Sequence, residues 1–173
     1  MLLGIDPSLT GTGVCILSST TLMYVSTISS KTKGIPRLLE IETAIQALLK
    51  DIDVVCIEGY GFGARGRAVF SLGELGGIIR RQLYLSGIPY YDVPPTVLKK
   101  FVTGKGNANK NVVLEQVFRK WGIGSETLKD DNQVDAYGLA RLALATIDQT
   151  TLTKYEKEAI KGIGPCIQQP LTS

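Results

Sequence analysis

The chain has 173 residues, of which 44% are hydrophobic and 20% are charged. One domain of this length can bury a substantial core, and the composition excludes wholesale disorder, a collagen-like repeat and a disulfide-stapled miniprotein. Nineteen Lys and Arg residues against 16 Asp and Glu residues give a net charge of +3, which permits a polyanionic partner without requiring one.

Three short β-prone runs open the chain, at residues 2–5, 13–17 and 21–28. Turn formers separate the first two runs, so we expect an antiparallel meander. The first apolar run is too short for export or membrane spanning and has no basic segment before it. We therefore expect a soluble protein of the cytoplasm.

Helices alternate with strands after the meander. Apolar residues at helical spacing predict helices over residues 35–50 and 69–86. Residues 53–57 form a continuous apolar run, typical of a strand buried in a parallel sheet, and residues 90–93 predict another strand that a Pro-Pro pair ends. This order predicts an α/β fold with a mixed sheet flanked by helices.

Two more helices are expected, at residues 111–121 and 134–147. The chain shows no internal repeat and no linker before residue 162. We therefore expect one domain over residues 1–161. Residues 162–173 carry prolines and no periodicity, which predicts a loose C-terminal tail.

Histidine is absent, which excludes a Ser-His-Asp triad, a Cys-His dyad and a His-ligated zinc site. The three cysteines are far apart, and Cys15 and Cys56 lie inside apolar runs. We interpret these two as buried thiols of a reducing compartment. Any catalysis must therefore use other groups.

Four carboxylates lie at the ends of apolar elements. Asp6 and Glu58 each follow a buried run, and Asp131 and Asp135 open the last predicted helix. Unpaired carboxylates are costly to bury, although Asp6 could be a turn residue before proline and Glu58 an ordinary strand end. Asp131 and Asp135 share one helix face, where their like charges repel. A helix cap would explain Asp131 but not Asp135.

A cation held between the two helical carboxylates would explain both of them. Oxygen ligands without histidine or thiolate suit Mg²⁺ or Mn²⁺ rather than zinc. Two such ions about 4 Å apart activate a water and stabilise the leaving oxygen in phosphodiester cleavage. The acidic pattern therefore favours a metal-dependent phosphodiesterase.

The chain resembles the RuvC-type Holliday junction resolvases of the ribonuclease H-like superfamily, most of all their bacteriophage members. The resemblance covers roughly residues 1–147, in family order and at family spacing. A lone Gly-Ile-Asp-Pro would be a weak signal, but four segments together are specific. They are Gly4 to Ser8 with Gly11 and Gly13, Ile57 and Glu58, Pro94 to Lys110, and Asp131 to Ala136.

The resemblance implies a ribonuclease H-like mixed β-sheet flanked by helices, with two Mg²⁺ or Mn²⁺ ions in each active site. By this likeness Asp6 bridges the two ions, Glu58 supports one of them and Asp135 supports the other. Many members place an Asp or His three residues before the last Asp, where this chain has Asn132. The fourth ligand role is therefore assigned to the neighbouring Asp131.

Basic residues follow in the matched segment between Lys99 and Lys110. Its glycines and Lys105 leave backbone amides and ammonium groups free to meet phosphates, although a solvated loop is an equally good reading of the sequence alone. By resemblance, Lys99 and Lys110 match two lysines beside the metal site. A cation there neutralises the scissile phosphate.

A glycine-rich segment with aromatic and basic residues follows Glu58. Arg65 and Arg67 could grip backbone phosphates, while Tyr60 or Phe62 stacks on an unpaired base at the crossover. The alternative is that these aromatics return to the core. The family carries a junction-probing aromatic in this region, and the choice between the two stays open.

The function implied is a divalent-metal-dependent endonuclease that nicks four-way DNA junctions by paired incisions, leaving 5′-phosphate and 3′-hydroxyl ends. Such an enzyme would serve recombination and repair or phage DNA processing, in a bacterial or phage-infected cytoplasm. Paired cuts across a two-fold junction suit a homodimer, and the apolar helix at residues 69–86 is the expected interface. Its Arg80 and Arg81 are expected to flank a packed helix and to contact the DNA backbone only if they are exposed.

Three alternatives are weighed against this reading. The sequence does not distinguish a junction resolvase from a related endonuclease that also cleaves flaps and replication forks. A catalytically inactive junction-binding protein has Asn132 as its only hint. Sugar-kinase and actin-like ATPases also carry an acidic-Gly turn after a first strand, but they need a second phosphate loop and a second lobe, for which 173 residues leave no room.

Overall fold

The computed structural model describes residues 1–60 and 67–166, with the side chains of residues 67 and 68 left out. Its centre is a six-stranded sheet with the order β3-β2-β1-β4-β5-β6. Strands β1, β2 and β3 form the expected antiparallel meander, β4 and β5 continue the sheet parallel to β1, and β6 is antiparallel. The strands are β1 (Leu2–Asp6), β2 (Thr12–Ser18), β3 (Thr21–Ile28), β4 (Val54–Glu58), β5 (Tyr90–Val93) and β6 (Pro165–Cys166).

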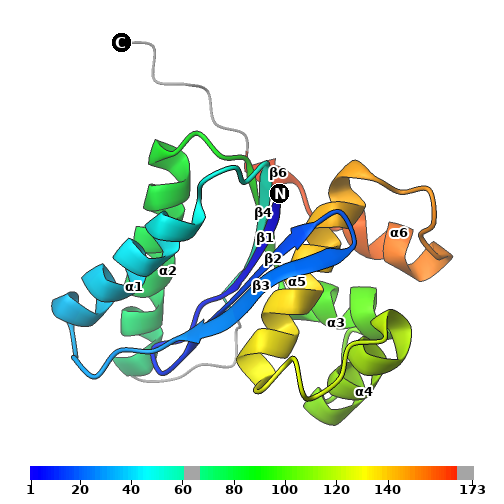
Figure 1. Cartoon of the computed structure of the whole chain (residues 1–173), viewed down its shortest axis with the longest axis horizontal. Coiled ribbons are helices and arrows are strands. Elements are labelled where there is room, and N and C mark those ends of the chain that lie inside the picture. Colours follow the sequence, from blue (N-terminus) through cyan, green and yellow to red (C-terminus); the bar gives the residue numbers. More distant parts are fainter. Residues whose placement is uncertain (61–66, 167–173) are drawn as a thin grey trace.

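Helices cover both faces of this sheet (Figure 1). Helices α1 (Ile35–Leu48) and α2 (Arg67–Leu85) lie on one face. On the other face, α5 packs directly across β1 and β2, and the three remaining helices lie around it. These helices are α3 (Pro95–Thr103), α4 (Lys110–Trp121), α5 (Asp131–Ile147) and α6 (Lys154–Ile160). The predicted mixed α/β fold is confirmed.

The central strands are buried on both faces, because alternate side chains enter two separate cores. Leu3, Ile5 and Ile57 pack under α1 and α2, whereas Leu2 and Cys56 pack under α5. A strand between two helical layers has a continuous apolar sequence, which is why β4 was predictable.

The two-sided burial of the strands also explains why two of the cysteines are inaccessible to solvent. The thiols of Cys15 and Cys56 are fully buried, as expected, and burial raises the pKa of Cys15 to about 12.

Two glycines let α5 approach the sheet closely. A Cβ on Gly4 would clash with the backbone of Ala136 and Ala140, and one on Gly13 would clash with the backbone carbonyl of Asn132. Glycine in a strand commonly marks such a close backbone approach. Because the first turns of α5 rest on β1 and β2, the acidic start of this helix lies beside the end of β1.

Helix α3 was not predicted, and Lys99 to Thr103, which the sequence analysis places in an open basic stretch, belong to it. The Pro-Pro pair that ends β5 also starts a helix, because proline suits the first helical turn. Lys99 therefore lies within α3, and Lys110 is the first residue of α4. The loop between the two helices is shorter than expected, and Lys105 lies exposed within it.

The C-terminal part also contains more structure than expected. Helix α6 starts with a capping box, in which Thr153 and Glu156 satisfy each other's backbone groups. Strand β6 then pairs with β5, through Tyr91 and Pro165 and through Tyr90 and Cys166. The chain is thus tied to the sheet as far as Cys166, which differs from the loose tail expected from residue 162. Residues 167–173 lie outside the described part.

Candidate active site

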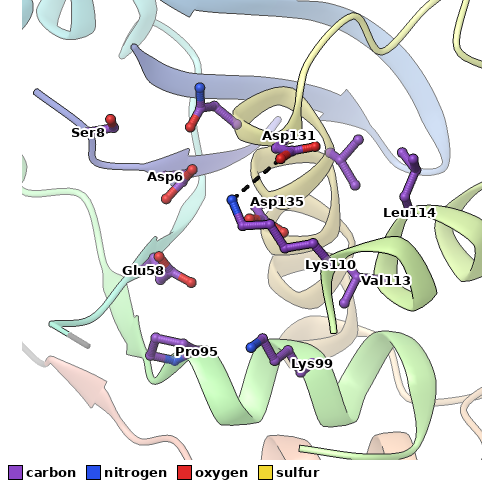
Figure 2. A pocket seen from close by; sticks show the side chains of 12 residues that line it. Asp6, Ser8, Glu58, Pro95, Lys99, Lys110, Val113, Leu114, Asp131 and Asp135 are labelled. Atoms are coloured by element: carbon purple, nitrogen blue, oxygen red, sulfur yellow. Dashed lines mark hydrogen bonds and ion pairs between the residues drawn. The ribbon is translucent and has the colours of Figure 1, made fainter. Parts of the chain in front are cut away.

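A cavity of about 280 Å³ opens where β1 and β4 end, beside the start of α5 (Figure 2). Helices α3 and α4 form its opposite wall. All six residues predicted to be catalytic line it, together with Ser8 and Asn132 and a small apolar rim. The lining residues are Asp6, Ser8, Glu58, Pro95, Lys99, Lys110, Val113, Leu114, Asp131, Asn132, Val134 and Asp135.

Asp6 and Glu58 become neighbours through the sheet. Strands β1 and β4 are parallel, with Ile5 opposite Ile57, so the next residue of each strand is a carboxylate on the α5 face. Asp6 is only 7% exposed, and Glu58 lines the same cavity beside it. Figure 2 shows both carboxyl groups pointing into the cavity.

Burial and mutual repulsion change the acidity of this pair. Burial, followed by the charge of Glu58, raises the pKa of Asp6 to about 8. Burial, followed by the charge of Asp135, raises the pKa of Glu58 to about 7. Ionisation of both carboxyl groups at once is therefore unfavourable in this cavity.

Asp135 brings a third carboxylate to the same place from α5. Its neighbours Val134 and Ala136 are buried against the sheet, which directs the first turns of the helix toward β1. Burial, followed by the charge of Asp6, raises the pKa of Asp135 to about 7. Three carboxylates from three elements therefore oppose one another's ionisation.

The donor set fits an oxygen-ligated divalent cation. Among the residues that the structure describes, no three His, Cys, Asp or Glu side chains are grouped closely enough to form a ready-made metal site. Nevertheless Asp6, Glu58 and Asp135 line one cavity, and each is harder to ionise because of the others. A divalent cation would remove that repulsion, and an all-oxygen set suits Mg²⁺ or Mn²⁺.

Asp131 lies at the rim of the cavity and is paired with a lysine. Lys110 Nζ lies 3.4 Å from Asp131 Oδ2, and the two side chains are 75% and 60% exposed. The expected cap role of Asp131 is wrong, because Asp130 is the N-cap and accepts a hydrogen bond from the Gln133 amide at 2.9 Å. Thr27 donates to the same Asp130 carboxylate at 2.6 Å. Capping therefore explains neither Asp131 nor Asp135.

Asn132 lines the cavity beside Asp131 but packs against the turn between β1 and β2. Its carbonyl contacts the backbone at Gly13, and its side-chain amide lies next to Gly11.

Ser8 also lines the cavity, although the sequence analysis gave it no role. The turn that holds Ser8 is fixed by a hydrogen bond from the Thr12 hydroxyl to the Ser8 carbonyl at 2.9 Å. The signal that could have found it is its place two residues after Asp6.

The two lysines approach the carboxylates from two different helices of the facing wall. Lys99 comes from α3 and Lys110 from the first turn of α4, and Figure 2 shows both side chains entering the cavity. Their positive charges lower the pKa of Glu58 and of Asp135 and so partly offset burial. Lys105 does not line this cavity.

The predicted DNA-binding residues after β4 are only partly described. Tyr60 is half exposed, its hydroxyl donates to the Gly73 carbonyl at 3.2 Å, and the Arg80 guanidinium lies 4.7 Å from its ring centre. Phe62 and Arg65 lie outside the described residues, as does the side chain of Arg67. Tyr60 is therefore seated on α2 and neither returns to the core nor stands free.

Comparison with known proteins places these features in a family. The family model described as crossover junction endodeoxyribonuclease RuvC matches residues 2–145. The RuvC protein of Brevibacillus brevis is 33% identical over 147 residues, covering 80% of this chain and 88% of that protein. The RuvC protein of a Sulfurovum species is 32% identical over 146 residues, covering 80% of this chain and 91% of that protein.

Solved structures share the fold at low sequence identity. Thermus thermophilus RuvC has a TM-score of 0.69 at 22% identity, covering 84% of this chain and 94% of that one. The same protein in complex with Holliday junction substrate has a TM-score of 0.70 at 19% identity, with coverages of 84% and 93%. The yeast mitochondrial Holliday junction resolvase Ydc2 has a TM-score of 0.58 at 12% identity, with coverages of 92% and 80%.

Proposed function

The chain belongs to the RuvC family of crossover junction endodeoxyribonucleases, and we propose that the cavity at the ends of β1 and β4 is its active site. The protein is a Holliday junction resolvase, a metal-dependent endonuclease that acts on four-way DNA junctions. The observation that carries the site assignment is the convergence of Asp6, Glu58 and Asp135 in one cavity, where burial and repulsion raise all three pKa values.

In this proposal Asp6, Glu58, Asp131 and Asp135 hold two Mg²⁺ or Mn²⁺ ions. Asp6 is central because the charge of Glu58 raises its pKa and its own charge raises the pKa of Asp135. The bound ions would supply activation of a water and stabilisation of charge at the leaving oxygen. The carboxylates must be ionised to bind a cation, and their pKa values are raised, so occupancy of the site depends on pH.

Lys110 and Lys99 are assigned to the phosphate. Lys110 is largely exposed and its only ion pair among the described residues is with Asp131, so its ammonium group can reach a phosphate at the cavity mouth. Lys99 lies deeper, on the α3 wall. Fixed cations there stabilise negative charge that develops on the scissile phosphate.

The remaining DNA contacts are proposed at Lys105 and in the segment after Glu58. Lys105 and Arg67 would bind backbone phosphates, and Arg65 would do so from the segment after Glu58. Tyr60 and Phe62 stay candidates for stacking on an unpaired base at the crossover. The half-exposed ring of Tyr60 supports the first of these, whereas Phe62 and Arg65 rest on the family resemblance alone.

We also propose a homodimer whose two active sites make the paired cuts that leave 5′-phosphate and 3′-hydroxyl ends. Helix α2 exposes apolar side chains at Val69, Phe70 and Leu85, which supports its role as the interface. A symmetric dimer matches a two-fold junction. Residues 1–161 are proposed as one nuclease domain, which β6 extends to Cys166.

The setting of this activity is a proposal as well. Among residues 1–60 and 67–166, no helix is both long and apolar enough to cross a membrane. We propose action in the cytoplasm, where the DNA substrate lies, in a bacterium or a phage-infected host. Kinship with bacteriophage members rests on the residue pattern, since the two sequence relatives named above are bacterial.

The test is cleavage of an immobile four-way junction, compared with a flap and a linear duplex of matched sequence, in Mg²⁺, Mn²⁺ or EDTA. We expect paired nicks at the junction with either metal and none in EDTA. Asp6→Asn should lower the rate at least about 10³-fold, because a metal-binding carboxylate is worth several kcal/mol in the transition state. The matched control is Glu115→Gln on α4, which removes an exposed carboxylate paired only with Arg119 among the described residues.

Each outcome decides between the alternatives. Equal cleavage of flaps and junctions would indicate a broader branched-DNA endonuclease. Junction binding without cutting in either metal would indicate an inactive junction-binding protein, with Asn132 as the residue to change back to an acid. Full activity of Asp6→Asn would overturn the assignment of this cavity.

A further inference from the structure

Arg80 joins helix α2 to strand β5 behind the active site. Its side chain is 15% exposed, its Nε donates to Asp92 Oδ1 at 2.8 Å, and its Nη2 forms a very short contact with the same oxygen. Its Nη1 also donates to the Gly76 carbonyl of its own helix at 3.0 Å. Two guanidinium nitrogens therefore converge on one carboxylate oxygen, which holds the group in one orientation.

The same guanidinium also reaches the end of β4. Its Nη2 lies 3.4 Å from the Glu58 carbonyl oxygen, and its Nη1 donates to the Tyr60 hydroxyl at 3.3 Å. Its centre lies 4.7 Å from the Tyr60 ring centre, a distance at which cation–π attraction operates. One side chain thus connects α2, β5, Glu58 and the first residues after β4.

Gly76 gives independent support that this arrangement is built into the sequence. A Cβ on Gly76 would lie 2.5 Å from the Tyr60 hydroxyl and 2.6 Å from Arg80 Nη1. The next residue, Gly77, has open space at the same position. Glycine is unfavourable inside a helix. Its presence at position 76 is explained by Tyr60 and Arg80, which pack against the helix backbone there.

Glu58, like Asp6, is the last residue of an inner strand, so its position depends on what holds the strand end. Asp6 lies on β1, between β2 and β4, and Asp135 lies inside α5. Glu58 is the last residue of β4, and beyond it the backbone is held to β5 by the bond from the Gly59 amide to the Val93 carbonyl at 2.8 Å. Arg80 holds the Glu58 carbonyl from the α2 side.

We propose that Arg80 is a positioning residue, which with Asp92 and Tyr60 fixes the end of β4 and so keeps the Glu58 carboxylate in place for cleavage. This inference rests on the proposed role of Glu58 in the active site. It gives Tyr60 a structural task behind the site, distinct from stacking on DNA. No atom of Arg80 needs to touch the junction or a metal ion.

The test compares Arg80→Gln with Arg81→Gln. Arg81 is the next residue of α2, its side chain is 65% exposed, and it lies 3.6 Å from Glu42 on α1, so the control removes the same charge from the same helix. We expect Arg80→Gln to lower the single-turnover rate at saturating junction by about tenfold to a hundredfold, since a displacement of about 1 Å in a catalytic group can cost that much. The metal concentration for half-maximal rate should rise, and Arg81→Gln should match the wild type in both.

Junction affinity in EDTA separates positioning from DNA contact. We expect Arg80→Gln to bind the junction within about twofold of the wild type, because a residue that contacts a phosphate would instead weaken binding uniformly. Arg80→Lys should recover only part of the rate, since a lysine keeps the charge but lacks the forked geometry. A loss of affinity with a normal rate at saturation would overturn the proposal in favour of a DNA contact.

A second pair of variants covers the case in which Arg80→Gln fails to fold. Gly76→Ala should displace Tyr60 and Arg80 and lower the rate, whereas Gly77→Ala should not. Equal rates in Gly76→Ala and Gly77→Ala would refute the positioning role. Glu58→Gln keeps the two hypotheses apart, because a fully active Glu58→Gln would refute the proposed site itself whatever Arg80 does.

Discussion

The two faces of the central sheet use the same strands in opposite ways. Under α1 and α2, residues such as Leu3, Ile5 and Ile57 form a dry apolar core. Under α5, alternate residues of the same strands also begin as core but end in Asp6 and Glu58. A strand buried on both faces can therefore carry a catalytic group on one face while its neighbouring residue anchors it on the other. The apolar layer holds the strand ends in place, and the opposite layer brings charges to them.

The largest effect should come from closing the gap between α5 and β1. Gly4→Ala places a Cβ against the backbone of Ala136 and Ala140, which cannot move without shifting α5. We expect a loss of about 3 kcal/mol in the free energy of unfolding, at the upper end of the cost of overpacking. Urea denaturation measures this loss, and cleavage should fall with it because Asp135 moves with the helix.

The control for this substitution lies on the other layer. Gly77 on α2 has open space where a Cβ would stand, and its backbone is not left-handed. Gly77→Ala should therefore raise the free energy of unfolding by about 0.5–1 kcal/mol through helix propensity. If the two alanine variants were equally stable, close packing of α5 on the sheet would not be what places the acidic helix start.

The next largest effect should be a pH dependence that originates in the α5 layer. The pKa values of Asp6, Glu58 and Asp135 are raised to about 8, 7 and 7. The folded protein therefore binds more protons than the unfolded chain between the ordinary carboxyl pKa, near about 4, and these raised values. By linkage, this contribution to stability is present below about pH 4 and is lost as pH rises through 7 to 8.

We therefore expect the melting temperature of the metal-free protein to fall by roughly 5 °C or more from pH 5 to pH 9, because 1 kcal/mol corresponds to about 2–4 °C in a domain of this size. Asp6→Asn should flatten this profile, since it removes the group with the most raised pKa. Mg²⁺ should raise the melting temperature more at pH 9 than at pH 5, because it binds ionised carboxylates. Unfolding followed by circular dichroism provides the measurement, and a profile that rises with pH would contradict it.

Much of the fold could be predicted because the apolar runs are long or bounded by clear turns. Strands β3 and β5 lie where the pattern places them, and α1 and α2 differ only at their ends. Helix α3 was missed because its Pro-Pro start looks the same as a strand stop. The cap of α5 was misplaced by one residue because Asp130 and Asp131 are adjacent, and only the hydrogen bond to Gln133 separates them.

The site, like the fold, has a part that local sequence motifs predict and a part that depends on contacts between distant residues. The six residues expected to be catalytic stand in motifs that a sequence displays, and the fold brings them to one cavity. The support behind them could not be predicted. Arg80, Asp92 and Tyr60 come from α2, from β5 and from the segment after β4, and they form no periodic pattern, so their contacts exist only once α2 and the sheet are in place.

The smallest effect on the free energy of unfolding is expected at the exposed rim of the cavity, where Asp131 pairs with Lys110. The pair of Asp131 with Lys110 is largely solvated, so Asp131→Asn should change the free energy of unfolding by less than about 1 kcal/mol. If Asp131 is the fourth carboxylate, the same change should still lower the cleavage rate in limiting Mg²⁺ by about tenfold, the lower range for loss of a metal-supporting group. Asp135→Asn should cost more, because that carboxylate is buried among the others.

The double variant Asp131→Asn, Asn132→Asp then decides which position faces the metal. Asn132 lines the same cavity but is held against the turn between β1 and β2 near Gly11 and Gly13. If that packing keeps residue 132 turned away from the ions, moving the acid by one position should not restore the rate. Full recovery would show that either offset on this helix face can supply the ligand, and that the rim tolerates rearrangement where the buried carboxylates do not.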